Sequence, residues 1–109
     1  MPIENNQDLR ALTQAMHEFV TNKGWYNPTS KRVQSPRSLA ISLSIEAAEV
    51  LELFQWGEEV HNAQELASEL ADVMLYLLQL ASIMEIDLGQ AVEEKLAINA
   101  KRTWDEDSP

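Results

Sequence analysis

The sequence predicts an all-α fold, arranged as a four-helix bundle. Apolar residues recur at spacings of three and four along four segments, which is the periodicity of helices that bury one face. No segment alternates apolar and polar residues as a strand does. The chain has only three Gly and four Pro, and they punctuate it instead of being scattered through it. With 109 residues, it fits one compact domain.

The first helix is expected over about residues 6–23. Its apolar stripe consists of Leu9, Leu12, Met16, Phe19 and Val20. Asn5 or Asn6 is available as the N-cap, and Gly24 is placed to end the helix. Residues 24–36 contain Gly, two Pro and small polar residues without periodicity, so they are expected to form a connecting loop.

The second helix is expected over about residues 36–56, with Ser35 as N-cap, Pro36 at its first position and Gly57 as its stop signal. One stripe consists of Leu39, Leu43, Glu46, Val50 and Leu53. The opposite surface is also apolar, with Ile41, Ile45, Ala48 and Phe54. A helix that is apolar on most sides is normally buried on most sides. We therefore expect a homo-oligomer, at least a dimer.

The third and fourth helices are expected over about residues 63–84 and 88–102. Asn62 with Glu65, and Asp87 with Gln90, have the spacing of helix-capping residues. The connection between the second and third helices is short, so these two helices should be antiparallel neighbours.

Composition excludes several classes of protein. Eighteen acidic against eight basic residues give a formal net charge of −10, which opposes binding to nucleic acid through its phosphates. Without cysteine there is no disulfide, thiolate nucleophile or Cys-based metal site. The N-terminal residues lack the order of a signal peptide, and carboxylates interrupt each long apolar stretch. We expect a cytoplasmic protein with no membrane partner.

Two pairs of carboxylates carry the chemistry that we predict. Glu46 and Glu49 lie three residues apart on the second helix, and Glu69 and Asp72 lie three residues apart on the third. Residues at this spacing share one helix face, so the pairs should meet between the helices. Sheltered carboxylates repel one another unless they are protonated or matched by cations. An all-oxygen site suits Mg²⁺, with Mn²⁺ as a substitute, and such ions commonly bridge to phosphates.

The same residues give a family resemblance. The ExxE, spacer and ExxD pattern of Glu46, Glu49, Glu69 and Asp72 resembles that of the MazG-like all-α nucleoside triphosphate pyrophosphohydrolases. SLAISLSIEAAEVLELFQW, ELADVMLYLLQLA and IDLGQAVEEKLAINAKR are most similar to the dCTP pyrophosphatase-like branch. The resemblance implies that the four carboxylates are catalytic and hold Mg²⁺, and that a dNTP is cleaved to dNMP and pyrophosphate. It also implies a homodimer or dimer of dimers and a role in nucleotide-pool housecleaning.

Further residues are candidates for substrate contacts. Lys95, Asn99 and Arg102 fall on one face of the fourth helix and are similar to the family's K-x3-N-x2-R segment, so they are expected to bind phosphate. Trp25 and Trp56 match aromatic positions that resemble base-sandwiching residues. Arg37 lies in the first turn of the second helix, where its charge opposes the helix dipole, so a ligand or a carboxylate is its expected partner.

Two alternatives compete with this interpretation. A non-enzymatic acidic module could oligomerise through the second and third helices, with its carboxylates solvated. A di-iron carboxylate bundle needs two Glu-x-x-His pairs, and this chain has at most one, because His17 does not follow a glutamate at that spacing and only His61 does, after Glu58. The sequence does not rank dCTP against dATP or noncanonical nucleotides.

Overall fold

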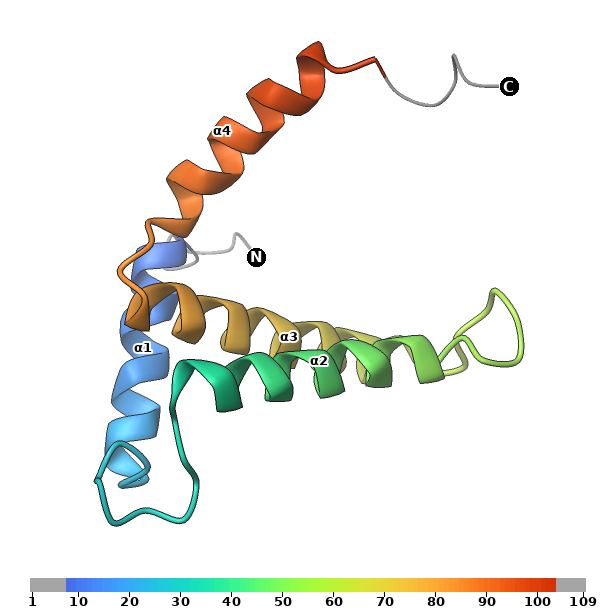
Figure 1. Cartoon of the computed structure of the whole chain (residues 1–109). Helices are drawn as coiled ribbons and strands as arrows, with labels where there is room; N and C mark the ends of the chain where they lie inside the picture. Colours follow the sequence, from blue (N-terminus) through green and yellow to red (C-terminus); the bar gives the residue numbers. More distant parts are fainter. Residues whose placement is uncertain (1–7, 104–109) are drawn as a thin grey trace, which may run out of the picture.

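The computed structural model describes residues 8–103, which form four helices (Figure 1). In chain order they are α1 (Leu9–Asn22), α2 (Pro36–Glu52), α3 (Ala63–Ile83) and α4 (Leu88–Lys101). These described residues contain no strand. The all-α class predicted from periodicity is therefore confirmed.

The N-terminal cap of α1 differs from the prediction. Asp8 is the N-cap, and its side chain accepts a hydrogen bond from the backbone N–H of Ala11 at 2.7 Å. The proposed caps Asn5 and Asn6 lie outside the described residues, before this start. Aspartate accepts the free N–H groups of a first turn as well as asparagine does, so the sequence offered several equivalent caps.

At its other end α1 stops at the predicted glycine. Gly24 has a φ of 77°, and the N–H of Trp25 donates to the carbonyl of Val20 at 3.1 Å. This pair of features is a Schellman motif, in which the left-handed residue reverses the chain and returns it to the last turn. It sets the starting direction of the α1–α2 loop, residues 23–35.

Helix α2 starts as predicted and ends earlier than predicted. Ser35 accepts from the N–H of Ser38 at 3.1 Å, and Pro36 occupies the first turn. The helix stops at Glu52 because the next N–H groups bond three residues back instead of four, as from Phe54 to Leu51 at 2.9 Å. Trp56 consequently lies in the turn region after the helix, so the predicted end at residue 56 was wrong.

The caps of α3 and α4 agree with the prediction. Asn62 accepts from the N–H groups of Gln64 and Glu65 at 2.9 and 3.3 Å, and Asp87 accepts from that of Gln90 at 3.0 Å. Between the two helices Glu85 adopts a φ of 59°, a conformation that few residues other than glycine visit. This turn sends α4 away from the other helices.

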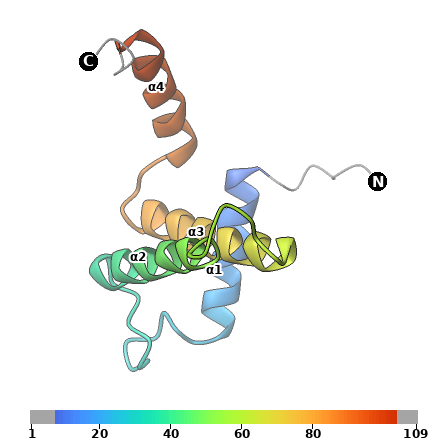
Figure 2. The ribbon, with the colours of Figure 1, turned by 90° about the vertical axis from the view of Figure 1, so that its right-hand side faces the viewer.

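The four helices do not close a bundle within one chain, which corrects the predicted four-helix bundle. Helices α2 and α3 lie antiparallel along most of their length, and α1 crosses α3 (Figures 1 and 2). Helix α4 contacts α3 beside the turn that joins them and then stands clear (Figure 2). The radius of gyration is 17.0 Å, against about 13 Å for a compact domain of this length.

The buried core is small and lies where α1 and the start of α2 meet the second half of α3. Its members are Met16, Val20, Leu39, Leu78 and Ala81, and the polar side chain of Gln79 is buried among them. Many apolar side chains outside it are half or more exposed, including Ile45, Leu70, Leu96 and Ile98. Helical periodicity identifies which face is apolar, but it does not say whether the covering face belongs to the same chain.

Helix α3 is the one described helix that is long and apolar enough to cross a membrane by length and composition alone. It also carries Glu69 and Asp72 and packs against both α1 and α2. Such contacts are those of the central helix of a folded domain. The absence of a membrane partner stays a prediction.

Candidate metal centre

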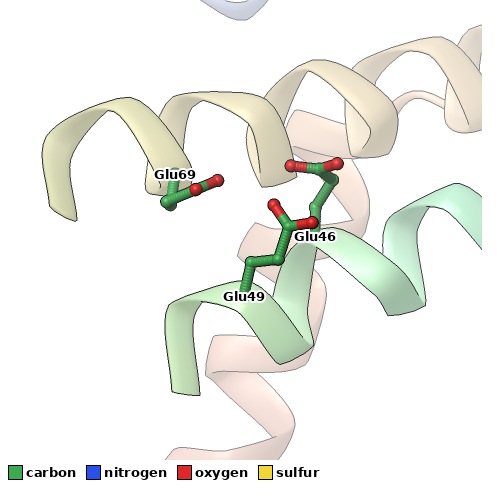
Figure 3. Close-up of side chains that lie close together, drawn as sticks. All are labelled: Glu46, Glu49 and Glu69. Carbon is green, nitrogen blue, oxygen red and sulfur yellow. The ribbon is translucent and has the colours of Figure 1, made fainter. Parts of the chain in front are cut away.

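Three carboxylates of α2 and α3 converge in the middle of the antiparallel pair. Glu46 and Glu49 come from successive turns of α2, and Glu69 faces them from α3 (Figure 3). One oxygen from each side chain lies within 4.8 Å of the other two. The predicted meeting of the two helix faces is thus observed for these three residues.

Asp72 lies in the electrostatic field of this group without joining the tight cluster of three. Its charge contributes to the raised pKa of both Glu46 and Glu69. Asp72 also lines the neighbouring cavity. The side chain therefore stands between the carboxylate cluster and that cavity.

The cluster is electrostatically unfavourable when all its members are ionised. Partial desolvation, followed by the nearby charges of other carboxylates, raises the pKa of Glu46 above its ordinary value. Desolvation and the charges of Glu49 and Asp72 raise the pKa of Glu69 in the same direction. No cationic side chain of the described chain contributes to either shift. Like charges without a counter-charge favour protonation or a bound cation.

The donor set fits a hard divalent ion. Mg²⁺ binds oxygen ligands at about 2.0–2.1 Å, so two oxygens on opposite sides of the ion are about 4 Å apart. A group of carboxylate oxygens within 4.8 Å of one another needs only small side-chain adjustments to reach this geometry. All three glutamates are half-buried, so an ion could reach them from solvent and remain partly sheltered. Mn²⁺ prefers the same oxygen donors.

A cavity of about 420 Å³ adjoins the centre on the side of Asp72. Its walls are mostly apolar and come from α1, the α1–α2 loop and α3, with Trp25, Tyr76 and Gln79 among them. The guanidinium of Arg32 lies 4.2 Å from the centre of the Trp25 ring, and Phe19 meets the same ring edge-on at 5.5 Å. Trp25 is therefore held in place at the cavity wall.

A larger hollow, of about 770 Å³, lies between α1 and the α3–α4 turn. None of the four predicted carboxylates lines it. Because the smaller cavity is lined by Asp72, we place the functional site there and not in the larger hollow.

Several predicted contact residues are not brought to the carboxylates within one chain. Lys95 and Asn99 lie on α4 and Arg102 is its C-cap, and this helix points away from α2 (Figure 1). Trp56 is 91% exposed in the turn region after α2. Arg37 is exposed in the first turn of α2. Their roles in phosphate, base and substrate binding stay predictions.

A polar network that the sequence did not predict lies behind the cavity. His17 contacts the Tyr26 hydroxyl at 2.6 Å through Nδ1 and Ser82 Oγ at 2.8 Å through Nε2. The side-chain amide of Gln79 donates to Tyr26 at 3.2 Å and to Gln34 at 2.7 Å. The available signal was the single glutamine in the apolar run LYLLQLA, a buried position that an alkyl side chain would ordinarily fill.

Comparison with known proteins gives the context for this geometry. The MazG-like family matches residues 41–108, which include most of α2 and all of α3 and α4. The chain belongs to the MazG-like family. The four carboxylates all lie inside the matched region.

Individual relatives of this MazG-like chain include enzymes with named substrates. It is 33% identical to human dCTP pyrophosphatase 1 and 32% identical to the mouse protein, in each case over 105 residues and 88% of the chain. The chain spans 57% of the length of these curated relatives. A shorter match, 44% identical over 36 residues, relates 33% of the chain to 34% of the dATP/dGTP diphosphohydrolase of cyanophage S-2L.

The fold of this MazG-like chain is that of a solved pyrophosphatase from Archaeoglobus fulgidus. The TM-score is 0.72 at 30% identity, and the match covers 100% of this chain and 99% of the other. The match therefore spans all four helices of this chain, α4 included.

Replacing Glu46 tests the metal centre without an activity assay. Because the folded-state pKa of Glu46 is raised, the ionised form disfavours the fold, and metal-free protein should lose stability as pH rises through that pKa. Glu46→Gln should have a higher melting temperature than wild type without metal at pH 7.5. Its rise in melting temperature on adding Mg²⁺ should be smaller, whereas wild type should gain about 2.7 kcal/mol when free Mg²⁺ is 100 times its Kd.

Glu52→Gln is the matched control, because Glu52 is an exposed glutamate at the end of the same helix. It removes the same charge from outside the cluster. Scanning calorimetry or thermal-shift measurements at several pH values, with EDTA or Mg²⁺, would compare the three proteins. Equal Mg²⁺ responses in the two variants would contradict the assignment of Glu46 as a ligand.

Proposed function

We propose that this protein hydrolyses nucleoside triphosphates, with a preference for deoxynucleotides such as dCTP, to the monophosphate and pyrophosphate. The observation that carries the proposal is the convergence of three glutamate oxygens within 4.8 Å between α2 and α3, beside Asp72. Membership of the MazG-like family, and relatives named for activity on dCTP or on dATP and dGTP, support the same reaction. Nucleotide-pool housecleaning in the cytoplasm is the cellular role that goes with it.

Glu46, Glu49, Glu69 and Asp72 are the proposed ligands of Mg²⁺, or of Mn²⁺ in its place. When bound, such an ion neutralises charge on phosphate oxygens and lowers the pKa of a coordinated water. The chain's own contribution is to hold four oxygen donors on two rigid, mutually packed helices. A carboxylate of this set that is not fully used in coordination would accept a proton from the attacking water, which displaces pyrophosphate at the α-phosphorus.

The cavity next to Asp72 is the proposed site of the base and sugar. Trp25 gives it an aromatic wall at one side, and the aromatic ring is fixed by Arg32 and Phe19. An aromatic face stacks on any nucleobase without selecting its edge. Trp56 is proposed as a second base contact and Arg37 as a substrate contact. Because neither residue lies beside the carboxylates of its own chain, each contact would have to come from a second copy of the chain.

A second copy of the chain is the proposed source of the phosphate-binding side chains. Lys95, Asn99 and Arg102 would bind the triphosphate, yet α4 of the same chain stands clear of α2. The apolar side chains of Val92, Leu96 and Ile98 on α4 are 48–63% exposed. Apolar surface on a helix that projects from its own chain is typical of an interface between subunits. We propose a homodimer or a dimer of dimers.

Incubation with Mg²⁺ and a full panel of NTPs and dNTPs tests the reaction. The expected products are a nucleoside monophosphate and pyrophosphate, separated from orthophosphate by ion-exchange chromatography. Asp72→Asn should lower kcat/KM by more than about 100-fold, since even a group that only orients a metal ligand commonly contributes 10- to 100-fold. Release of orthophosphate alone, or full activity in Asp72→Asn, would contradict the proposal.

The non-enzymatic alternative gives a different result in the same experiment. An acidic oligomerisation module would hydrolyse none of these nucleotides, and Mg²⁺ would not raise its melting temperature by mass action. Both measurements separate it from the proposed enzyme.

Substitution of Leu96 tests the proposed assembly. Leu96 is 63% exposed on α4, so Leu96→Glu should leave the helical content of the chain unchanged. If a second copy covers this face, the charge becomes buried and unpaired, and the oligomer should dissociate. Light scattering coupled to gel filtration would measure the mass, with the exposed polar Glu93→Gln on the same helix as control. A monomeric wild-type protein would overturn the proposal.

Truncation of Trp25 tests the base site. Stacking on an aromatic side chain contributes about 1–3 kcal/mol per base, so Trp25→Ala should raise KM by roughly 5- to 150-fold. The value of kcat should change less, because the carboxylates are untouched. Trp25→Phe keeps an aromatic face and should retain most of the affinity. An unchanged KM in Trp25→Ala, measured by steady-state kinetics, would remove Trp25 from the site.

A further inference from the structure

Gln79 is a buried amide at the wall of the proposed base cavity. The side chain is 3% exposed, among apolar residues of α3. An amide in such surroundings is costly unless its polar atoms find partners. Its nitrogen has two, because Nε2 donates to the Tyr26 hydroxyl and to Gln34 Oε1.

The surrounding network determines which way the amide faces. Gln34 donates its own Nε2 to the backbone carbonyl of Arg32 at 3.1 Å, so its oxygen must face Gln79 and accept. The Tyr26 hydroxyl accepts from Gln79 and also contacts His17 Nδ1, while the other ring nitrogen of His17 contacts Ser82. Both amide hydrogens of Gln79 are therefore used. Turning the amide over would place the Gln79 oxygen against the Gln34 oxygen, two acceptors that cannot bond to each other.

The side-chain oxygen of Gln79, Oε1, takes no part in this network. Within residues 8–103, Gln79 Oε1 has no hydrogen-bond partner, although the residue is almost fully buried and lines the 420 Å³ cavity. An acceptor without a protein partner, on a residue that lines a cavity, is a position where a ligand donor would bind. The network thus presents a fixed hydrogen-bond acceptor to whatever occupies the cavity.

The position of Gln79 along α3 matches the far end of a nucleotide. Asp72 and Gln79 line the same cavity and are seven residues apart, which is nearly two helical turns, or about 10 Å. This separation is comparable with the distance from the 5′ oxygen of a nucleoside to the outer edge of its base. A nucleotide with its phosphates at the carboxylates would bring that outer edge to Gln79.

We propose that Gln79 is a specificity-determining residue, whose Oε1 accepts a hydrogen bond from the exocyclic amino group on the outer edge of the base. The inference rests on the proposed nucleotide hydrolysis and narrows its substrate class. Cytosine and adenine carry an amino group at this edge, whereas uracil, thymine and hypoxanthine carry a carbonyl oxygen. A carbonyl would place two acceptors face to face, and the fixed amide could not turn to correct this.

Matched nucleotide pairs test the inference on the wild-type protein. The kcat/KM for dCTP should exceed that for dUTP by about 10- to 100-fold, and dATP should exceed dITP by a similar factor, because a buried polar group left unpaired discriminates strongly. A ratio below about 2 in both pairs, or a preference for the keto bases, would overturn the role of Gln79 while leaving nucleotide hydrolysis intact. No hydrolysis of any nucleotide would overturn the proposed function itself.

Gln79→Met assigns the discrimination to the residue, since methionine keeps the length of the side chain without its amide. It should lower kcat/KM for dCTP by about 5- to 100-fold, change that for dUTP by less than about 3-fold, and so bring the ratio close to 1. Tyr26→Phe is the matched control, because it removes one partner of the amide nitrogen and leaves Gln34 to hold the amide. Its dCTP-to-dUTP ratio should stay within about 3-fold of wild type.

The pair of variants separates recognition from a general effect on packing. An unchanged ratio in Gln79→Met would overturn the inference. An equal loss of discrimination in both variants would also overturn it, because it would show that the network as a whole and not the Gln79 oxygen sets the preference. If Gln79→Met does not fold, the wild-type ratios still decide the question.

Discussion

The mutual repulsion of carboxylates on α2 and α3 is the constraint on which the structure depends. Glutamates normally point into solvent, where water screens their charge. Here the antiparallel pair holds Glu46, Glu49 and Glu69 at close range, and the pKa values of Glu46 and Glu69 are raised by desolvation and by these neighbouring charges. The apolar contacts between α2 and α3 must outweigh that cost in the absence of a cation. The repulsion favours a cation as the ligand, and it requires a helix pair that is rigid enough to hold the carboxylates together.

Local signals in the sequence predicted the helices well and the tertiary arrangement less well. Ser35, Asn62 and Asp87 act as caps because each interaction involves only the next few residues. The early end of α2 depends on a change to three-residue hydrogen bonds, which no Gly or Pro marks. The open position of α4 depends on the left-handed backbone conformation of Glu85. Glutamate seldom adopts this conformation, so the sequence does not indicate the turn. Closure of a bundle was inferred from apolar faces, and those faces remain exposed.

The candidate site shows the same division between local and distant information. Spacing of three residues placed each pair of carboxylates on one face, and the short connection between α2 and α3 brought the faces together. The network of Gln79, Tyr26 and Gln34 joins residues 45 to 53 positions apart, so no periodicity could reveal it. A single polar residue inside an apolar run was the only trace. The role of Gln79 becomes apparent only when the α1–α2 loop packs against α3 and brings Tyr26 and Gln34 to its side-chain amide.

The carboxylate cluster and the neighbouring cavity are held in place by different parts of the structure. The carboxylates are held by the backbone packing of two long helices, whereas the cavity wall is carried by α1 and by a loop that is attached through side-chain hydrogen bonds. Substitutions in that loop leave the reaction centre in place. Selectivity can therefore drift during evolution while the chemistry is conserved, so that a lineage could retarget such an enzyme to damaged or modified bases through a few changes in one segment.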